Sequence, residues 1–434
     1  MSREMVDSGF AWMGDIPADW SMTRIQTQLC EINEKNNPVR VSDVLSLTNT
    51  RGVIPYEDKG NVGNKSKENV EDYKIAYPDT IVANSMNILI GSVGYCKYYG
   101  CVSPVYYVFA PTKYANIHFM DYFMSMTAFQ KELRRNANGI LEIRMRVSVA
   151  DILKKKMALP SMDEQRQIVS FLDRKCSAID TAIEKTKKSI EKLEEYKKAV
   201  ITKAVTKGLD PDAKMKDSGV EWIGEVPEGW EIRPLKFTSD SISKGNGITK
   251  DDVVEDGDMQ CVRYGEIYFQ YDLSFSQCKS KTRLNKVSSP QFFSYGDILC
   301  AGTGELIDEI GKPIVYLGDQ NCLAGGDIVI VKHKQNPRFL EYALSSSYAQ
   351  AQRSLGKYKL KVVHISAGEI GSIKIALPNI TEQNRIADYL DNKIADITKV
   401  IDNKLAVISK WEEYKKSLIY YAVTGKIDCR NEVL

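Results

Sequence analysis

Clustered cations are the residues of this sequence with the clearest potential for chemistry. They occur in two stretches, RRNANGILEIRMRVSVADIL and RSLGKYKLKVVHISAGEIG, each of which leads into a short expected helix. Guanidinium and ammonium groups bind phosphates, and they also read the edge of guanine in the DNA major groove. A run of charges can equally form a solvated surface, so both interpretations stay open. The candidate DNA-contacting residues are Arg134, Arg135, Arg144, Arg146, Arg353, Lys357, Lys359 and Lys361.

Side chains suited to catalysis or metal binding are scarce. There are three histidines, at 118, 333 and 364, and we expect each to be a structural or surface residue. The nine cysteines form no C-x-x-C pair, which favours reduced thiols over zinc ligands or disulfides. The glycines at 302 and 304 do not complete G-x-G-x-x-G, and neither a G-x-x-x-x-G-K-[ST] loop nor a [DNS]-P-P-[YFW] motif occurs. We therefore expect a chain without catalytic residues, metal or cofactor.

The composition is that of a globular protein. The chain has 434 residues, of which 43% are hydrophobic and 27% charged, and this excludes a mostly disordered or collagen-like chain. Its 59 Lys+Arg and 57 Asp+Glu give a formal net charge of +2, so a DNA-binding surface must come from the arrangement of its cations. No membrane-length apolar run and no signal-peptide pattern are present, so we expect a cytoplasmic protein.

An internal repeat indicates which segments of the chain position these cations. Residues 7–25 and 217–235 share a W-x-G-x-x-P-x-x-W pattern, with seven identities in 19 positions at an offset of 210. We call these two segments the first and second Trp elements. Residues 158–206 and 376–424 share 22 identities in 49 positions at an offset of 218. The regions between these repeats, about 26–157 and 236–375, differ in most residues, so similar ends surround two dissimilar middles.

Long helices are expected over the second repeat. Each copy begins with a capping box directly after a proline, Ser161-x-x-Glu164 and Asn379-x-x-Glu382. Apolar residues then recur at steps of 4 and 3 over about four heptads, which is typical of a coiled coil and less so of a single core helix. A helix over 162–206 would be about 68 Å long at ~1.5 Å per residue. The stripe residues expected to pack between helices or against partners are Ile179, Ile183, Ile190, Leu193, Ile397, Ile401, Ile408 and Trp411.

The predicted fold class is α/β (α+β), with two globular domains separated by two long antiparallel coiled-coil helices. Apolar runs at 80–83, 105–110, 297–301 and 327–331 predict short strands in the domains. A direct repeat around antiparallel helices produces internal pseudo-twofold symmetry, which matches the local symmetry of DNA and two half-sites of a split sequence. The predicted segments are 1–157 with the first Trp element, 158–210 with the first helix, 211–375 with the second Trp element, and 376–434 with the second helix and a C-terminal tail.

The chain resembles the specificity subunit of type I restriction-modification systems. The resemblance is carried by the Trp elements, by the ALP-x-x-x-EQ-x-x-I motif at 158–168 and 376–386, and by the repeated EEYKK helix, and it covers essentially the whole chain. It implies that 1–157 and 211–375 are target-recognition domains that each read one half of a bipartite site on double-stranded DNA. It further implies that the helices set the spacer and dock two methyltransferase subunits, that restriction/translocase subunits join them, and that this chain is non-catalytic.

Two other functions stay open from the sequence. One is a specificity subunit of a modification-only methyltransferase complex, which would lack a translocase partner. The other, from a different class, is a coiled-coil interaction protein with no role on DNA.

Overall fold

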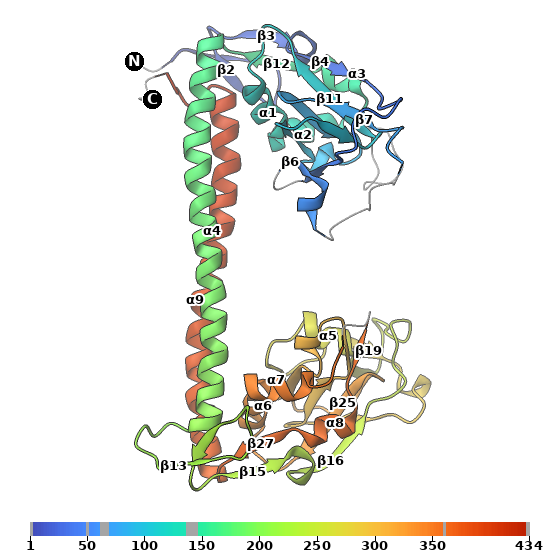
Figure 1. The fold of residues 1–434 in the computed structure, drawn as a ribbon, viewed down its shortest axis with the longest axis vertical. Coiled ribbons are helices and arrows are strands. Elements are labelled where there is room, and N and C mark those ends of the chain that lie inside the picture. The colour runs from blue at the N-terminus through green and yellow to red at the C-terminus, as the bar shows by residue number, and fades with distance from the viewer. Residues whose placement is uncertain (1–2, 49–51, 61–68, 136–145, 359–361, 431–434) are drawn as a thin grey trace. The chain divides into compact units, whose positions relative to one another are not determined.

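The computed structural model describes residues 3–48, 52–60, 69–135, 146–358 and 362–430, and the chain forms two compact units. Unit 1 consists of Met1–Thr186 with Leu405–Leu434, and unit 2 of Lys187–Lys404. Each unit contains one Trp element, one domain of strands and short helices, and parts of two long helices, α4 (Met162–Lys207) and α9 (Ile380–Val423) (Figure 1).

The domain of unit 1 is built on a four-stranded antiparallel sheet with the order β4-β11-β8-β9. Its strands are β4 (Leu29–Ile32), β11 (Tyr106–Pro111), β8 (Thr80–Asn84) and β9 (Val93–Cys96). All five residues of β8 are buried, as a central strand with apolar neighbours on both faces requires. Two further pairs, β5 (Leu45–Thr48) with β6 (Gly52–Pro55) and β7 (Lys74–Ala76) with β10 (Gly100–Val102), extend the domain.

Two helices of unit 1, α1 (Ile117–Ser125) and α2 (Thr127–Arg134), pack beside this sheet (Figure 1). Their buried aromatic residues form a cluster with the first Trp element. The rings of Phe123 and Phe129 are 4.8 Å apart, and Trp12 lies 6.0 Å from Phe123. The first Trp element is therefore part of the core of unit 1 and not a separate appendage.

The domain of unit 2 is built mainly on two larger sheets. The five-stranded sheet has the order β16-β25-β21-β23-β18, and the four-stranded sheet has the order β19-β17-β24-β20. The first consists of β16 (Ser239–Lys244), β25 (Ile328–His333), β21 (Ile298–Ala301), β23 (Pro313–Tyr316) and β18 (Ser274–Phe275). The second consists of β19 (Ser280–Thr282), β17 (Met259–Val262), β24 (Cys322–Ala324) and β20 (Phe292–Phe293). The strands predicted at 80–83, 105–110, 297–301 and 327–331 are thus confirmed as β8, β11, β21 and β25.

The Trp elements and the strands that flank the domains follow one plan in both units. In each Trp element a short strand pair forms, β1 (Met5–Asp7) with β2 (Asp15–Pro17) and β13 (Met215–Asp217) with β14 (Glu225–Pro227). The last strand of each Trp element pairs with the strand before each long helix, β3 (Ser21–Arg24) with β12 (Lys156–Leu159) and β15 (Glu231–Pro234) with β27 (Lys374–Leu377).

The short helices of the domains also correspond between the units. The helices α6 (Pro337–Ser345) and α7 (Ser347–Ser354) have the same lengths as α1 and α2, so the first residue of α1 corresponds to the first residue of α6. Further along the chain, α3 (Val149–Lys154) corresponds in the same way to α8 (Ala367–Ser372). The offset between the two copies is smaller by two at α3 and α8 than at the preceding helices.

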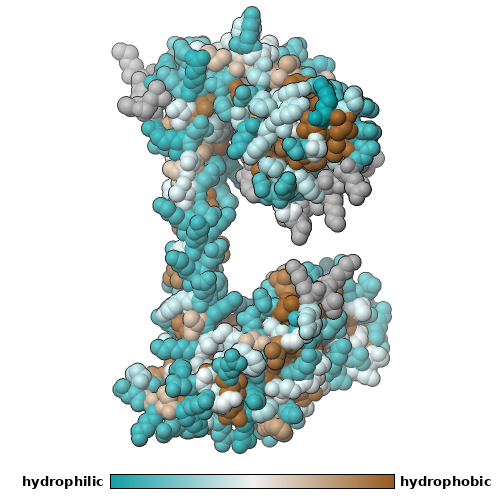
Figure 2. Space-filling model, in the orientation of Figure 1, coloured by the Kyte–Doolittle hydropathy of each residue, from teal (hydrophilic) through white to brown (hydrophobic). Residues whose placement is uncertain are grey.

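The long helices confirm the heptad prediction. The helix α4 begins at Met162 and ends one residue beyond the predicted 206. In unit 1 the stripe residues Ile179, Ile183 and Ile408 are buried, and in unit 2 Ile397 and Ile401 share one apolar core with the domain. Within each unit the portions of α4 and α9 lie side by side and run antiparallel, and their outer faces are largely hydrophilic (Figures 1 and 2). The apolar stripe of each helix therefore points toward its neighbour and the adjoining domain.

Two of the lysines that interrupt the apolar stripes, Lys415 and Lys197, are ion-paired. Lys415 Nζ lies 2.7 Å from a carboxylate oxygen of Asp180 on α4. Lys197 is buried along its stem and its Nζ lies 2.9 Å from Asp272 Oδ2 in the domain of unit 2. Long stems that pack while the amine reaches a carboxylate explain how these positions tolerate a charge.

A glycine in the left-handed region follows each long helix within two residues, and each glycine faces a tryptophan and a proline of a Trp element. Gly208 has φ +70°, and a Cβ built on it would lie 3.4 Å from Trp230 Cζ2 and 3.7 Å from Pro227 Cγ. Gly425 has φ +74°, and a Cβ there would lie 3.0 Å from Trp20 Cζ2 and 2.4 Å from Pro17 Cγ. A side chain at either position would be strained by the backbone and, at Gly425, would also clash.

Candidate nucleic-acid and partner interfaces

The predicted cations of unit 1 that the structure describes lie on its surface. Arg134 and Arg135 are exposed at the end of α2, where Arg135 Nη1 lies 3.1 Å from Glu132 Oε2. Arg146 is exposed just before α3, with Nη2 3.9 Å from Met86 Sδ. Arg144 lies outside the described residues. These arginines are placed where a nucleic acid can reach them, so they stay candidate contacts.

Arg353 of unit 2 is not at the surface. Its side chain is only 6% exposed, Nε donates to the carbonyl of Ile310 at 3.1 Å, and Nη1 donates to that of Leu344 at 2.5 Å. Burial lowers the pKa of its guanidinium to about 10. The prediction that Arg353 contacts DNA is therefore wrong, because its donors hold backbone carbonyls inside the domain.

The change of offset within the domains explains the error over Arg353. The offset of the long-helix repeat aligns Arg353 with the exposed Arg135, but the offset between α2 and α7 is larger by two. In the register of these helices Arg353 takes the place of Leu133, which is fully buried in unit 1. The position belongs to the core in both units, and unit 2 fills it with a long cation.

The remaining predicted cations of unit 2 are partly described. Lys357 Nζ lies 2.5 Å from Glu369 Oε1 and donates to the carbonyl of His364 at 2.7 Å. Lys359 and Lys361 lie outside the described residues. Because Glu369 also closes the capping box of α8 with Ser366, Lys357 contributes to local structure at the start of that helix.

The histidines and cysteines have structural surroundings. His118 lies 4.5 Å from the ring of Tyr95, and His364 Nδ1 lies 3.1 Å from Thr303 Oγ1. Burial lowers the pKa of His333. All nine cysteines are free thiols and seven are buried. Within the described residues no group of His, Cys, Asp and Glu is arranged to hold a metal ion, and none of the helices has the length and apolar character needed to cross a membrane.

The glutamate and glutamine at the start of α4 bind two different parts of unit 1. Trp20 Nε1 donates to Glu164 Oε2 at 2.9 Å, which fixes the Trp element to the helix. Asn116, the N-cap of α1, donates its backbone N–H to Gln165 Oε1 at 3.1 Å. Gln165 Nε2 in turn donates to the carbonyl of Pro160 at 3.2 Å. The two adjacent residues thus join the Trp element, the domain and the helix.

Unit 2 repeats each of these bonds at the start of α9. Trp230 Nε1 donates to Glu382 Oε2 at 3.1 Å, and the backbone N–H of Asn336 donates to Gln383 Oε1 at 3.0 Å. Gln383 Nε2 donates to the carbonyl of Pro378 at 2.9 Å. The EQ pair that stands out in the sequence therefore has one structural role in both copies, at a joint we call the EQ joint.

A tyrosine–aspartate bond further along each helix supports the EQ joint. Tyr122 of α1 donates to Asp173 of α4 at 2.7 Å, and Tyr342 of α6 donates to Asp391 of α9 at 2.8 Å. Sequence reasoning missed these residues, although Asp173 and Asp391 are identical in the long-helix repeat. Three repeated contacts thus fix the orientation of each domain on its own helix.

An acid with a buried carboxyl oxygen, Asp121 or Glu341, lies next to each of these tyrosines. Burial raises the pKa of Asp121 to about 7 and that of Glu341 to about 8. Among the described residues one oxygen of each carboxyl group has no hydrogen-bond partner. Glu341 Oε1 accepts from Ser345 Oγ at 2.6 Å. Glu341 therefore favours the protonated form at neutral pH, and Asp121 takes up a proton at a much higher pH than an exposed aspartate does.

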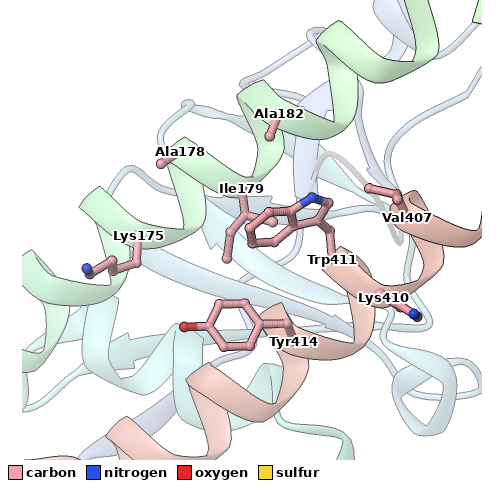
Figure 3. Close-up of a pocket in the computed structure, with 8 residues that line it drawn as sticks. All are labelled: Lys175, Ala178, Ile179, Ala182, Val407, Lys410, Trp411 and Tyr414. Carbon is pink, nitrogen blue, oxygen red and sulfur yellow. The ribbon is translucent and has the colours of Figure 1, made fainter. Parts of the chain in front are cut away.

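A groove of about 680 Å³ lies between α4 and α9 in unit 1 (Figure 3). The indole of Trp411 and the side chain of Ile179 line the groove from opposite helices, and the phenol of Tyr414 borders it from the same helix as Trp411 (Figure 3). Trp411 is 37% exposed although it belongs to the predicted stripe, so it is only partly covered by α4. The other lining residues are Lys175, Ala178, Ala182, Val407 and Lys410.

The repeat does not conserve this groove in unit 2. In the long-helix repeat Trp411 corresponds to Leu193, and Ala182 corresponds to Val400. In unit 1 the groove lies between the small Ala178 and Ala182 on α4 and the large Trp411 on α9. In unit 2 the bulkier Val400 replaces Ala182 and the smaller Leu193 replaces Trp411. The two helix surfaces are thus chemically different despite the common plan.

Comparisons with known proteins agree with this plan. A family model described as the type I restriction modification DNA specificity domain matches residues 17–195 and 227–407. The chain is 30% identical over 286 residues to the type I restriction enzyme MjaVIII specificity subunit of Methanocaldococcus jannaschii, covering 64% of this chain and 63% of that protein. It is 24% identical over 443 residues to the putative type I restriction enzyme MjaX specificity subunit of the same organism, covering 96% and 95%.

A solved structure has the same fold. It comes from work described as the structural basis of complex assembly and conformational transition of the type I R-M system. The TM-score is 0.69 at 14% identity, with 95% of this chain and 99% of that chain covered.

Proposed function

The chain belongs to the type I restriction-modification DNA specificity family, and on that premise we propose that it supplies the DNA sequence recognition of a type I restriction-modification complex. Each domain reads one half of a bipartite site on double-stranded DNA. The observation that carries this proposal is that the family match falls on both halves of the repeat, at 17–195 and 227–407. The EQ joint, present in both units, holds each reader in one orientation on its helix, which suits recognition of a fixed half-site.

The chemistry on DNA belongs to partner subunits in this proposal. Two DNA methyltransferase subunits modify an adenine in each half-site, and restriction/translocase subunits add cleavage. This chain supplies the recognition of the DNA sequence and works in the cytoplasm. The lengths of α4 and α9 determine how many base pairs between the half-sites are left unread.

The groove at Trp411 is the proposed docking site for one methyltransferase subunit. A partly exposed tryptophan beside a tyrosine and small residues is typical of an interface centre. Lys175 and Lys410 point away from the groove in Figure 3, so a partner with acidic residues around an apolar anchor fits best.

Methylation mapping tests the DNA-recognition proposal. We expect the source cell to methylate one bipartite sequence when this gene is present and to lose that methylation when it is deleted. A complex of this chain with its methyltransferase that binds no duplex sequence-specifically would contradict the proposal and favour a coiled-coil interaction protein. Affinity purification distinguishes the remaining alternative, because a modification-only complex lacks the translocase.

A matched pair of variants tests the docking site. Trp411→Ala should weaken methyltransferase binding by at least about 30-fold, the size expected for an interface centre. Leu405→Ala removes an exposed apolar side chain of the same helix outside the groove and should leave binding unchanged. Equal effects of the two variants would argue against docking at the groove.

A further inference from the structure

A cleft of about 640 Å³ opens in unit 2 between glycine-rich turns and the helix α5 (Tyr264–Phe269). Its lining comes from residues 247–250, 263–266, 269–270 and 325–327. The two turns are closely packed, since a Cβ on Gly245 would lie 2.2 Å from the carbonyl oxygen of Gly325. Gly325 N–H also donates to the carbonyl of Val262 at 2.8 Å. Part of the cleft wall is therefore rigid backbone that a planar ligand can approach closely.

Arg263 lines this cleft, and a buried carboxylate holds its guanidinium. Glu266 is almost fully buried; its Oε2 accepts from the backbone N–H of Arg263 at 2.9 Å, and its Oε1 accepts from Arg263 Nη2 at 3.2 Å. Ser280 Oγ donates to the same Oε1. Both oxygens of Glu266 thus accept hydrogen bonds, and the bond from Arg263 Nη2 restricts the orientation of the guanidinium.

One donor of Arg263 nevertheless has no partner in the described part of the chain. The side chain of Arg263 is 28% exposed, and its Nε is buried without a hydrogen-bond partner among the described residues. A buried donor without a partner is costly, and ligand binding that pairs it removes the cost.

The rest of the cleft suits a nucleic-acid base. Phe269 is 90% exposed at the end of α5 and Tyr264 is partly exposed at its start. Lys250 adds a second exposed cation, whereas the acidic Asp327 lies 3.4 Å from Lys244 Nζ. Cations and hydrogen-bond donors match the backbone and base edges of DNA, and the exposed aromatic side chains add apolar contact surface.

The position of Glu266 favours a guanine over a phosphate as the partner of Arg263. A carboxylate in contact with the guanidinium offsets its charge, which reduces its value for a phosphate. The same contact orients the planar fork, and an oriented fork matches the O6 and N7 acceptors of guanine.

From these contacts we infer that Arg263 is a specificity-determining residue of unit 2 and reads a guanine in the half-site recognised by that unit, with Glu266 as its positioning residue. The inference rests on the proposed function, because it assigns part of the sequence reading to one side chain.

Methylation of a site library tests this inference. The complex of the full chain with its methyltransferase is given duplexes in which the half-site read by unit 2 is randomised and the other half-site is kept. Arg263→Ala should relax the preference at one G·C pair by about 10- to 100-fold and leave all other positions unchanged. Glu266→Gln keeps the volume and should relax the same pair by a smaller factor. Arg283→Ala is the matched control, since this exposed arginine pairs with Asp256 in the same unit at 2.5 Å and should change no position.

Two results would overturn the inference. Uniform weakening for all sequences, with the salt dependence of binding reduced by about one phosphate contact, would make Arg263 a phosphate contact. An unchanged preference at every position, with a lowered unfolding temperature, would make the Arg263–Glu266 pair purely structural. Failure of the unaltered complex to methylate any specific sequence would instead refute the proposed function, so the two failures are distinguishable.

Discussion

Removing the glutamine of one EQ joint should destabilise one unit by a predictable amount. Gln165 is 1% exposed, its Oε1 accepts from Asn116 N–H at 3.1 Å, and its Nε2 donates to the Pro160 carbonyl at 3.2 Å. Gln165→Ala leaves that part-buried N–H and that buried carbonyl without these partners, and it removes side-chain atoms from a packed site.

The magnitude follows from these two groups. A buried donor or acceptor without a partner costs about 1–3 kcal/mol, so the pair gives roughly 3 kcal/mol after partial relaxation. For a domain of about 200 residues each kcal/mol shifts the midpoint of thermal unfolding by about 2–4 °C. We therefore expect the transition of unit 1 to fall by about 6–12 °C.

Calorimetry of single and double variants is the assay. Gln383→Ala, the equivalent change at the start of α9, should lower the transition of unit 2 by a similar amount. The effects of the two changes should add to within about 0.5 kcal/mol, because the residues share no partners. Arg166→Ala is the control, since this neighbouring side chain is exposed and should shift neither transition. A shift below about 2 °C for Gln165→Ala would refute the structural role of the EQ joint.

Two further predictions concern buried ionisable side chains in unit 2. Burial raises the pKa of Glu341 from 4.5 to about 8, so the folded chain keeps a proton that the unfolded chain releases, and its contribution to stability is lost as the pH rises through this range. Glu341→Gln should therefore raise the unfolding temperature of unit 2 more at pH 8.5 than at pH 5. An equal change of the unfolding temperature at both pH values would contradict this prediction. An equal pH dependence in the control Glu195→Gln, at an exposed residue, would contradict it too. Arg353→Met should lower the unfolding temperature, because the carbonyls of Ile310 and Leu344 lose their donor. The DNA affinity of the folded complex should stay within about twofold. A loss of DNA affinity at unchanged stability would show that Arg353 contacts DNA after all.

The long helices and their starts could be predicted because their signals are local. A capping box places the start of α4 within one turn, and a heptad stripe continues for as long as its apolar residues recur. The strands β8, β11, β21 and β25 were also predictable, since each is a short apolar run between turn residues. The order of strands in the sheets was not, because pairing joins segments that no local pattern relates.

The site was harder to predict, because its residues act across long stretches of chain. The EQ pair was visible as a repeated motif, but its partner Trp20 is 144 residues away from Glu164. Arg353 was misassigned because the offset of the long-helix repeat does not hold for α7, and only the helix register shows that it replaces Leu133. Arg263 was missed because the glycines at 325 and 326 beside it indicate only a turn. The buried Glu266 holds the side chain of Arg263 in place, and the burial of Glu266 depends on the fold around it.

The glycines at the ends of the long helices bear on how such a chain arises. At Gly208 the helix and the Trp element that it meets are consecutive in the chain, whereas at Gly425 they come from its opposite ends, and Lys426 Nζ donates to the carbonyl of Asp15 at 2.9 Å. The contact therefore forms with or without a peptide link across it. A half-length ancestor with one Trp element, one domain and one helix would carry both complementary surfaces and assemble as a symmetric dimer. Duplication and fusion of its gene would preserve those surfaces while freeing the two domains to evolve separate sequence preferences.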